Sequence, residues 1–204
     1  MIKARYSRFY TWFFFDFYFA LRYKIQFRKM SFFPDVKIED NQSVLLLQNH
    51  YSWHDGYWSY SISKNIVKRR FHVMMLEEQL QKRMFLHRCG VFSVKKNSRS
   101  AIDSLYYSKE LLQHPGNLVT IYPTGQFHTL HQQNMKFQAG IDRIVKGKTE
   151  HIAIVMAVTL IDFFGFPSPE VRIYLENYSG ERNADAIEKA YLSFYQSCIS
   201  KQTE

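Results

Sequence analysis

The 204-residue sequence predicts an α/β domain whose mixed, largely parallel sheet is covered by helices on both faces. Two observations predict this fold. Short apolar segments alternate with longer segments of helical periodicity, and the apolar segments are nearly continuous, as in strands buried on both faces. An apolar content of 46% is enough for one compact core. The expected strands are residues 43–48, 71–76, 90–94, 117–122, 152–159 and 171–175.

Three segments have apolar residues spaced three or four positions apart, which is typical of helices: residues 77–88, 100–113 and 183–200. In the first of them Leu80, Met84 and His87 are expected to share one face. No linker, repeat or low-complexity tract interrupts the chain. We therefore expect one domain over residues 34–204, with residues 1–33 as an appended helical segment.

The first 30 residues carry most of the excess positive charge. Basic residues exceed acidic ones by nine in the whole chain, and residues 1–30 hold seven basic residues against Asp16 alone. The same stretch is rich in Phe, Tyr and Trp. Its run without basic residues between Arg8 and Arg22 is 13 residues long, whereas crossing a bilayer takes roughly 20. No small-residue cleavage site follows, so a removed secretory signal is not expected.

A short, basic and aromatic-rich helix is typical of an anchor that lies in the membrane interface. We expect peripheral (monotopic) attachment to the cytoplasmic face of a membrane, with membrane lipids as partners. The two cysteines lack disulfide or metal spacing, which favours a reducing compartment. Alternatively, the aromatic side chains face the domain core, and both arrangements can hold on different sides of one helix. The expected anchor residues are Arg5, Arg8, Trp12, Phe13, Phe17, Arg22 and Lys24.

The first strand leads into the most informative motif. His50 leaves the strand, and Asp55 follows five residues later in the first turn of an expected helix. The carboxylate can then accept the imidazole N–H, which fixes the tautomer and lets the other ring nitrogen take a proton from a hydroxyl. A structural turn explains the pair alone equally well. His54 directly precedes Asp55, so its ring is expected to point elsewhere, and no nucleophile elbow is present.

These residues are similar to the first motif, Asn-His-x-x-x-x-Asp, of the glycerophospholipid (lysophosphatidic acid) acyltransferases, with Asn49 as its first member. The resemblance extends over residues 45–158. Residues 90–96 resemble the second of the family's sequence blocks, with Lys96 where an Arg is usual. The third resembles residues 122–127, which keep the aromatic, Pro and Gly of Phe-Pro-Glu-Gly-Thr-Arg but not the Glu, Thr or Arg. A Phe-x-x-Gly element at 137–140 and an apolar strand at 153–158 follow.

The resemblance implies acyl transfer from an acyl-CoA or acyl carrier protein thioester to a hydroxyl of a lysophospholipid-like lipid. His50 would be the general base and Asp55 its orienting partner, with neither metal nor bound cofactor. The altered third block leaves a non-phosphorylated acceptor, such as a glycolipid, a lipoamino acid or a pigment sugar, as the alternative. Candidates for binding an anionic acceptor are Lys95, Lys96, Arg99, Thr124 and Gly125. Candidates for an acyl pocket, or for core packing, are Trp53, Tyr57, Trp58 and Phe92.

The rival class is a non-catalytic basic protein that binds membranes or nucleic acid, since a sequence pI near 9.5 with interleaved aromatic residues also fits single-strand binding. This class explains the charge but not the ordered motifs. Most of the excess charge lies in the N-terminal segment, so nucleic acid is not expected as a partner.

Overall fold

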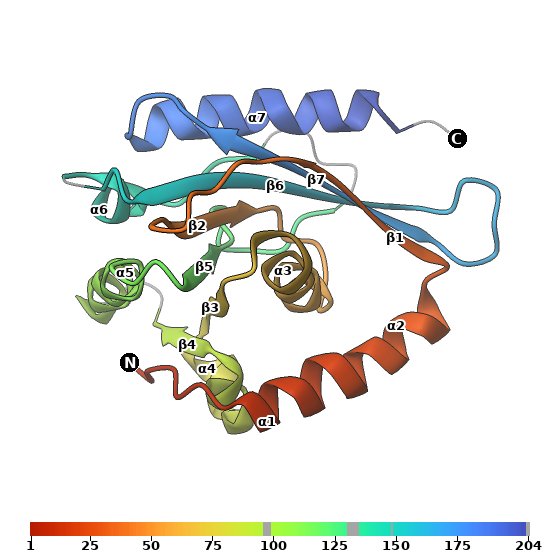
Figure 1. The fold of residues 1–204 in the computed structure, drawn as a ribbon, viewed down its shortest axis with the longest axis horizontal. Helices are drawn as coiled ribbons and strands as arrows, with labels where there is room; N and C mark the ends of the chain where they lie inside the picture. Colours follow the sequence, from red (N-terminus) through yellow and green to blue (C-terminus); the bar gives the residue numbers. More distant parts are fainter. Residues whose placement is uncertain (96–98, 130–134, 148, 203–204) are drawn as a thin grey trace.

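The computed structural model describes residues 1–95, 99–129, 135–147 and 149–202. They form one seven-stranded sheet in the order β1-β7-β6-β2-β5-β3-β4 (Figure 1). Only the β6–β7 pair is antiparallel, so the mixed, largely parallel sheet is confirmed. The strands are β1 (Lys29–Asp35), β2 (Ser43–Gln48), β3 (Arg70–Leu76), β4 (Val91–Val94), β5 (Asn117–Ile121), β6 (Ile152–Asp162) and β7 (Glu170–Tyr178).

Strand β1 is an element that the sequence pattern does not predict. It lies at the edge of the sheet, parallel to β7, with Lys29 opposite Glu170. An edge strand bonds to a neighbour on one side only, so it tolerates Pro34 within it. The boundary expected between residues 33 and 34 therefore falls inside a strand.

The helical segments match two of the three expectations closely. They are α1 (Arg8–Thr11), π-helical Trp12–Phe19, α2 (Ala20–Gln26), α3 (Asp55–Ile62), π-helical Ser63–Val67, α4 (Glu77–Gln81), 3₁₀-helical Met84–Cys89, α5 (Arg99–Leu111), α6 (Ile141–Val145) and α7 (Ala184–Ser200). The Asn183 side chain caps α7 by accepting a hydrogen bond from the Ala186 N–H at 2.8 Å.

The single helix expected over residues 77–88 is wrong. The chain leaves the helical conformation at Arg83, and Met84 is exposed instead of facing inward. Leu80 and Leu86 are both buried. Residues six apart lie about 240° apart around a continuous α-helix, so the break allows both leucines to reach the core.

Each face of the sheet has its own core, and alternate residues of β2 contribute to the two. Val44 and Leu46 join the cluster under the N-terminal segments and α3, whereas Leu45 and Leu47 join the cluster under α5, α6 and α7. Figure 1 shows α7 on one side of the sheet and α2 on the other. Coverage of both faces explains why the strands are apolar throughout.

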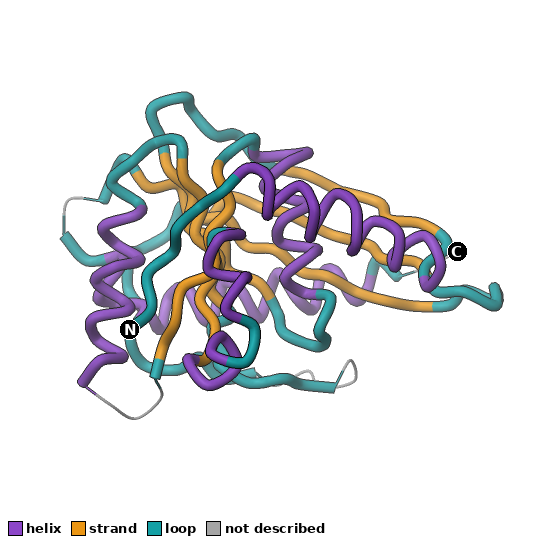
Figure 2. Tube along the Cα trace, turned by 90° about the horizontal axis from the view of Figure 1, so that it is seen from below, coloured by secondary structure: helices purple, strands orange, loops and turns teal. Residues whose placement is uncertain are grey.

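Residues 8–26 form a nearly unbroken helix, which we call the N-terminal helix. Its inner side packs Phe15 and Phe19 into the core, while Phe13 and Phe17 are exposed on its outer side. In Figure 2, which views the molecule from below, this helix lies in front of the sheet. Among the described residues, no helix is both long and apolar enough to cross a membrane. Core packing and an exposed aromatic surface thus occur on different sides of the same helix.

Backbone hydrogen bonds attach both ends of the N-terminal helix to the rest of the domain. Before it, the Ile2 N–H donates to Ser93 Oγ at 2.6 Å and the Ser93 N–H donates to the Ile2 carbonyl at 2.9 Å. After it, the Arg28 N–H donates to the Pro169 carbonyl at 2.9 Å. The helix is therefore part of the domain and cannot be removed without opening one of its two cores.

Candidate active site

The carboxyl ends of β2 to β6 meet at one edge of the sheet, because these strands are mutually parallel. At this edge Asn49 fixes the loop that follows β2. Its side-chain amide donates to the Thr159 carbonyl and accepts from the Thr159 N–H, both at 2.8 Å. The buried Asn49 amide thus replaces a pair of strand hydrogen bonds and sets the position of the next residue, His50.

Asp55 begins α3 and is 1% exposed. Its Oδ2 atom lies 2.7 Å from Nδ1 of His50 and also accepts the backbone N–H groups of Tyr51 at 2.6 Å and Ser52 at 2.8 Å. Three donors thus converge on one carboxylate oxygen. The Asp55 carboxylate therefore favours the tautomer of His50 that carries its proton on Nδ1 and leaves Nε2 as the base.

Two aromatic rings enclose the imidazole of His50. Tyr122, which directly follows β5, stacks on one side with ring centroids 4.1 Å apart, and Phe127 stacks at 4.0 Å. Burial raises the pKa of the Tyr122 hydroxyl, which therefore stays protonated. The described residues form no hydrogen bond to Nε2 of His50, whose side chain is 20% exposed. The open part of the imidazole is thus a narrow edge between aromatic walls.

A tight turn positions these two rings. The Gly125 N–H donates to the Tyr122 carbonyl at 2.9 Å, and Gly125 has a φ of +62°, where glycine is favoured. Thr124 is buried, and its hydroxyl donates to the Gln126 carbonyl at 3.0 Å. Thr124 and Gly125, which the sequence suggested as anion-binding residues, thus shape the turn that carries Tyr122 and Phe127 to His50.

The other anion-binding candidates lie farther from His50. Lys95 directly follows β4, at the same edge of the sheet but three strands away from β2. Lys96 lies outside the described residues. Arg99 begins α5, and its side chain is also outside the described part of the structure. The described geometry therefore brings aromatic rings, rather than these cations, into contact with the imidazole.

Of the four aromatic candidates for an acyl pocket, three are packing residues. Tyr57 stacks on Phe19 with ring centroids 5.5 Å apart, and Trp58 is buried against Phe27. These contacts join α3 to the N-terminal segments. The third, Phe92, is buried in the core on the opposite face of the sheet. Trp53 is exposed, and the guanidinium of Arg83 lies 4.7 Å from its ring centroid.

His54 points away from the Asp55 carboxylate. Its Nε2 atom lies 2.7 Å from Oε1 of Gln26, and its ring stacks against Trp58. Burial lowers the pKa of His54, and the positive charge of Arg22 lowers it further. The two neighbouring histidines thus occupy different environments, and only His50 contacts the carboxylate.

Sequence patterns alone do not identify Tyr122 and Phe127 as neighbours of His50. Tyr122 is next to His50 because β5 is the neighbour of β2 in the sheet, and strand order cannot be derived from hydrophobic periodicity. The signal that the sequence does contain is the position of the third block at the end of an expected strand.

Comparison with known families agrees with the motif order. A family model described as Acyltransferase matches residues 24–158, from α2 into β6, and so includes His50, Asp55 and Tyr122. A search of curated proteins finds no match. The family match covers well over half of the 204-residue chain. This protein therefore belongs to the acyltransferase family and is an acyltransferase.

Proposed function

We propose that the protein transfers a fatty acyl group from an acyl-CoA or acyl carrier protein thioester to a hydroxyl of a lipid at the cytoplasmic surface of a membrane. The observation that carries this proposal is the 2.7 Å contact between His50 Nδ1 and Asp55 Oδ2. It leaves Nε2 of an oriented imidazole for proton transfer, at the edge of the sheet where α/β enzymes gather reactive groups.

In the proposed reaction, Nε2 of His50 takes the proton of the acceptor hydroxyl as its oxygen attacks the thioester carbon. The tetrahedral intermediate then expels the thiolate, which takes the proton back from the imidazolium. The carboxylate of Asp55 stabilises the imidazolium between the two steps. The products are an oxygen ester and a free thiol, and no covalent acyl-enzyme is required.

The aromatic surroundings of His50 favour the alternative acceptor class, a non-phosphorylated lipid. Phe127 is 61% exposed while stacked on the imidazole. An acceptor that approaches this edge meets a carbon surface, which suits the apolar face of a sugar ring or a glyceride better than a phosphate. A lysophospholipid-like acceptor would need a cation at the same edge of the sheet to bind its phosphate. Among the described residues, Lys95 is a candidate for that cation.

The test is the activity of His50→Ala against the parent, with a panel of lysophosphatidic acid, lysophospholipids and glycolipids as acceptors. We expect the variant to lose at least about 10²-fold in rate with every acceptor used. His54→Ala is the matched control, because it removes a neighbouring imidazole that does not contact Asp55. Parental activity in His50→Ala would contradict the proposed base, and the panel separates the two acceptor classes.

Attachment to the membrane is proposed for the outer side of the N-terminal helix. All seven expected anchor residues have exposed side chains. The basic ones can bind anionic headgroups while the rings enter the interface. Deleting residues 1–29 would also remove Phe15 and Phe19 from the core, so surface variants are the better test.

We expect Trp12→Ser combined with Phe13→Ser and Phe17→Ser to move the protein from sedimented anionic vesicles to the supernatant. The non-catalytic rival predicts instead that single-stranded oligonucleotides compete with vesicles at moderate salt. Unchanged vesicle binding in this triple variant would contradict the anchor.

A further inference from the structure

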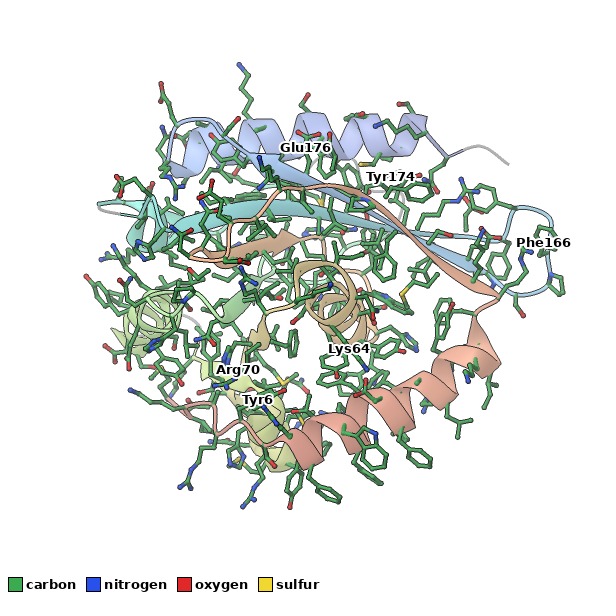
Figure 3. All side chains as sticks on the ribbon, in the orientation of Figure 1. Tyr6, Lys64, Arg70, Phe166, Tyr174 and Glu176 are labelled. Carbon is green, nitrogen blue, oxygen red and sulfur yellow. The ribbon has the colours of Figure 1, made fainter. Side chains whose placement is uncertain are left out.

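The hairpin between β6 and β7 presents a second exposed aromatic surface. Its loop, residues 163–169, has the sequence FFGFPSP, with Phe163 54% and Phe166 45% exposed. Figure 3 shows Phe166 in this loop, at the far end of the two strands. Neighbouring exposed aromatic side chains of this kind mark a candidate site for contact with a membrane or a protein.

The hairpin projects beyond the active-site edge. Gln48, the last residue of β2, pairs with Ala157, and β6 continues for five residues to Asp162. At 3.3 Å per residue this extension is roughly 16 Å long. The loop therefore stands out past the end of β2, on the side of the sheet from which His50 emerges.

Arginine side chains accompany the rings of the loop. The guanidinium of Arg28 lies 3.6 Å from the ring centroid of Phe166, and that of Arg172 lies 4.0 Å from Phe164. Both arginines also form ion pairs with Glu170, which is buried. The charges of the two arginines are balanced by Glu170 and by the exposed Asp162, which precedes the loop and accepts the Phe163 N–H at 2.7 Å. Rings beside guanidinium groups match the boundary between acyl chains and anionic headgroups.

The loop adjoins the end of the N-terminal helix. Its Pro169 carbonyl accepts the Arg28 N–H, and Figures 1 and 2 both show the end of α2 on the same side of the molecule as the hairpin. The last exposed apolar residues of the helix are Leu21 and Ile25. The end of the helix and the loop thus adjoin one another.

We infer that the tip of the β6–β7 hairpin is a second lipid contact, which acts with the N-terminal helix to hold the active-site edge against an anionic bilayer. This inference rests on the proposed membrane function. An anchor along the helix alone would leave the domain free to rotate about the helix axis, whereas a further contact at the hairpin tip, beyond the end of the helix, would fix its orientation. The acceptor hydroxyl could then reach Nε2 of His50 from the bilayer surface.

The test compares vesicle partitioning of Phe163→Ser/Phe166→Ser with the parent, on phosphatidylcholine vesicles containing about one fifth phosphatidylglycerol. We expect partitioning to be about 10- to 100-fold weaker, because two half-exposed rings lose their apolar contact. Activity on a micelle-dispersed acceptor and the thermal midpoint are expected to stay parental. Tyr106→Ser on α5 is the matched control, since Tyr106 is 55% exposed but lies on a helix away from the hairpin.

A labelling experiment gives an independent measurement. Cys89 and Cys198 are both buried, so a cysteine introduced by Phe163→Cys can be labelled selectively with an environment-sensitive dye in the folded protein. A blue shift on vesicle addition, absent in labelled Tyr106→Cys, would support the inference.

The outcomes are distinguishable from failure of the proposed function. If the parent and the double variant bind vesicles equally well, the hairpin is not a lipid contact, but the proposed membrane function still stands. Loss of affinity for acyl carrier protein with unchanged vesicle binding would also overturn the hairpin contact, because the loop would then be a protein-docking site. If the parental protein does not bind vesicles, the proposed membrane function is refuted as well.

Discussion

Replacing Asp55 with Asn tests the active-site geometry most directly. The substitution preserves side-chain volume, and an amide oxygen can still accept from His50 Nδ1, Tyr51 N–H and Ser52 N–H. What it removes is the negative charge beside the imidazolium that forms during proton transfer. A hydrogen bond to a charged partner is worth about 1.5–3 kcal/mol, and each 1.36 kcal/mol corresponds to a tenfold change in rate. We therefore expect kcat/KM to fall by about 10- to 150-fold.

The assay is steady-state release of the free thiol from the acyl donor, followed with a thiol-reactive dye, together with thermal unfolding. KM for the donor is expected to change little if Asp55 acts only through His50. Asp55→Ala is the contrasting variant, because it leaves three partly buried donors without their acceptor, at about 1 kcal/mol each, and should lower the thermal midpoint. If Asp55→Asn lowers the midpoint while kcat/KM stays parental, the carboxylate serves only to shape the turn and has no electrostatic role in proton transfer.

Two further predictions concern stability. Gly90 has a φ of +93°, and a Cβ there would lie 2.2 Å from the Phe71 carbonyl oxygen. Gly90→Ala should therefore lower the free energy of unfolding, measured in urea, by at least about 2 kcal/mol. Gly116→Ala is the control and should leave the free energy of unfolding near the parental value, because its Cβ meets no atom within 4 Å. Burial, and to a smaller extent the positive charge of Arg70, lower the pKa of His72 to about 4. Between pH 6.5 and pH 4 the imidazole is therefore protonated in the unfolded chain but neutral in the native state. The parent should thus be about 2 kcal/mol less stable at pH 5 than at pH 7, and urea titrations should show a smaller loss in His72→Leu; an equal loss would contradict this assignment.

The buried strands could be predicted from the sequence because burial on both faces leaves a continuous apolar run. SVLLLQ at residues 43–48 is such a run, and its bounds match β2. Strand β1 could not be found this way, since its residues are mostly exposed and Pro34 interrupts the pattern. The pattern over residues 77–88 predicts too long a helix because Met84 fits the helical periodicity, although the structure places Met84 at the surface.

For the site, local spacing was enough to suggest the contact between His50 and Asp55, because both lie in one short loop. The enclosure of the imidazole by Tyr122 and Phe127 depends on strand order, which joins segments about 70 residues apart. Trp58 illustrates the opposite case. A large aromatic beside the motif suggested a pocket, but tertiary packing against Phe27 buries it.

The attachment of the N-terminal helix at both ends has a consequence during synthesis. Arg28 is 142 residues from its partner Glu170 on β7. At ribosomal rates of about 5–20 residues per second, the helix emerges roughly 7–28 s before that strand. During this interval Tyr57 and Phe71 become available to Phe19 and Phe15, but the sheet above them is incomplete and the outer aromatic side of the helix is exposed. The nascent chain is therefore most prone to aggregate before β7 has been made, and a nearby bilayer would shield the helix until the sheet is complete.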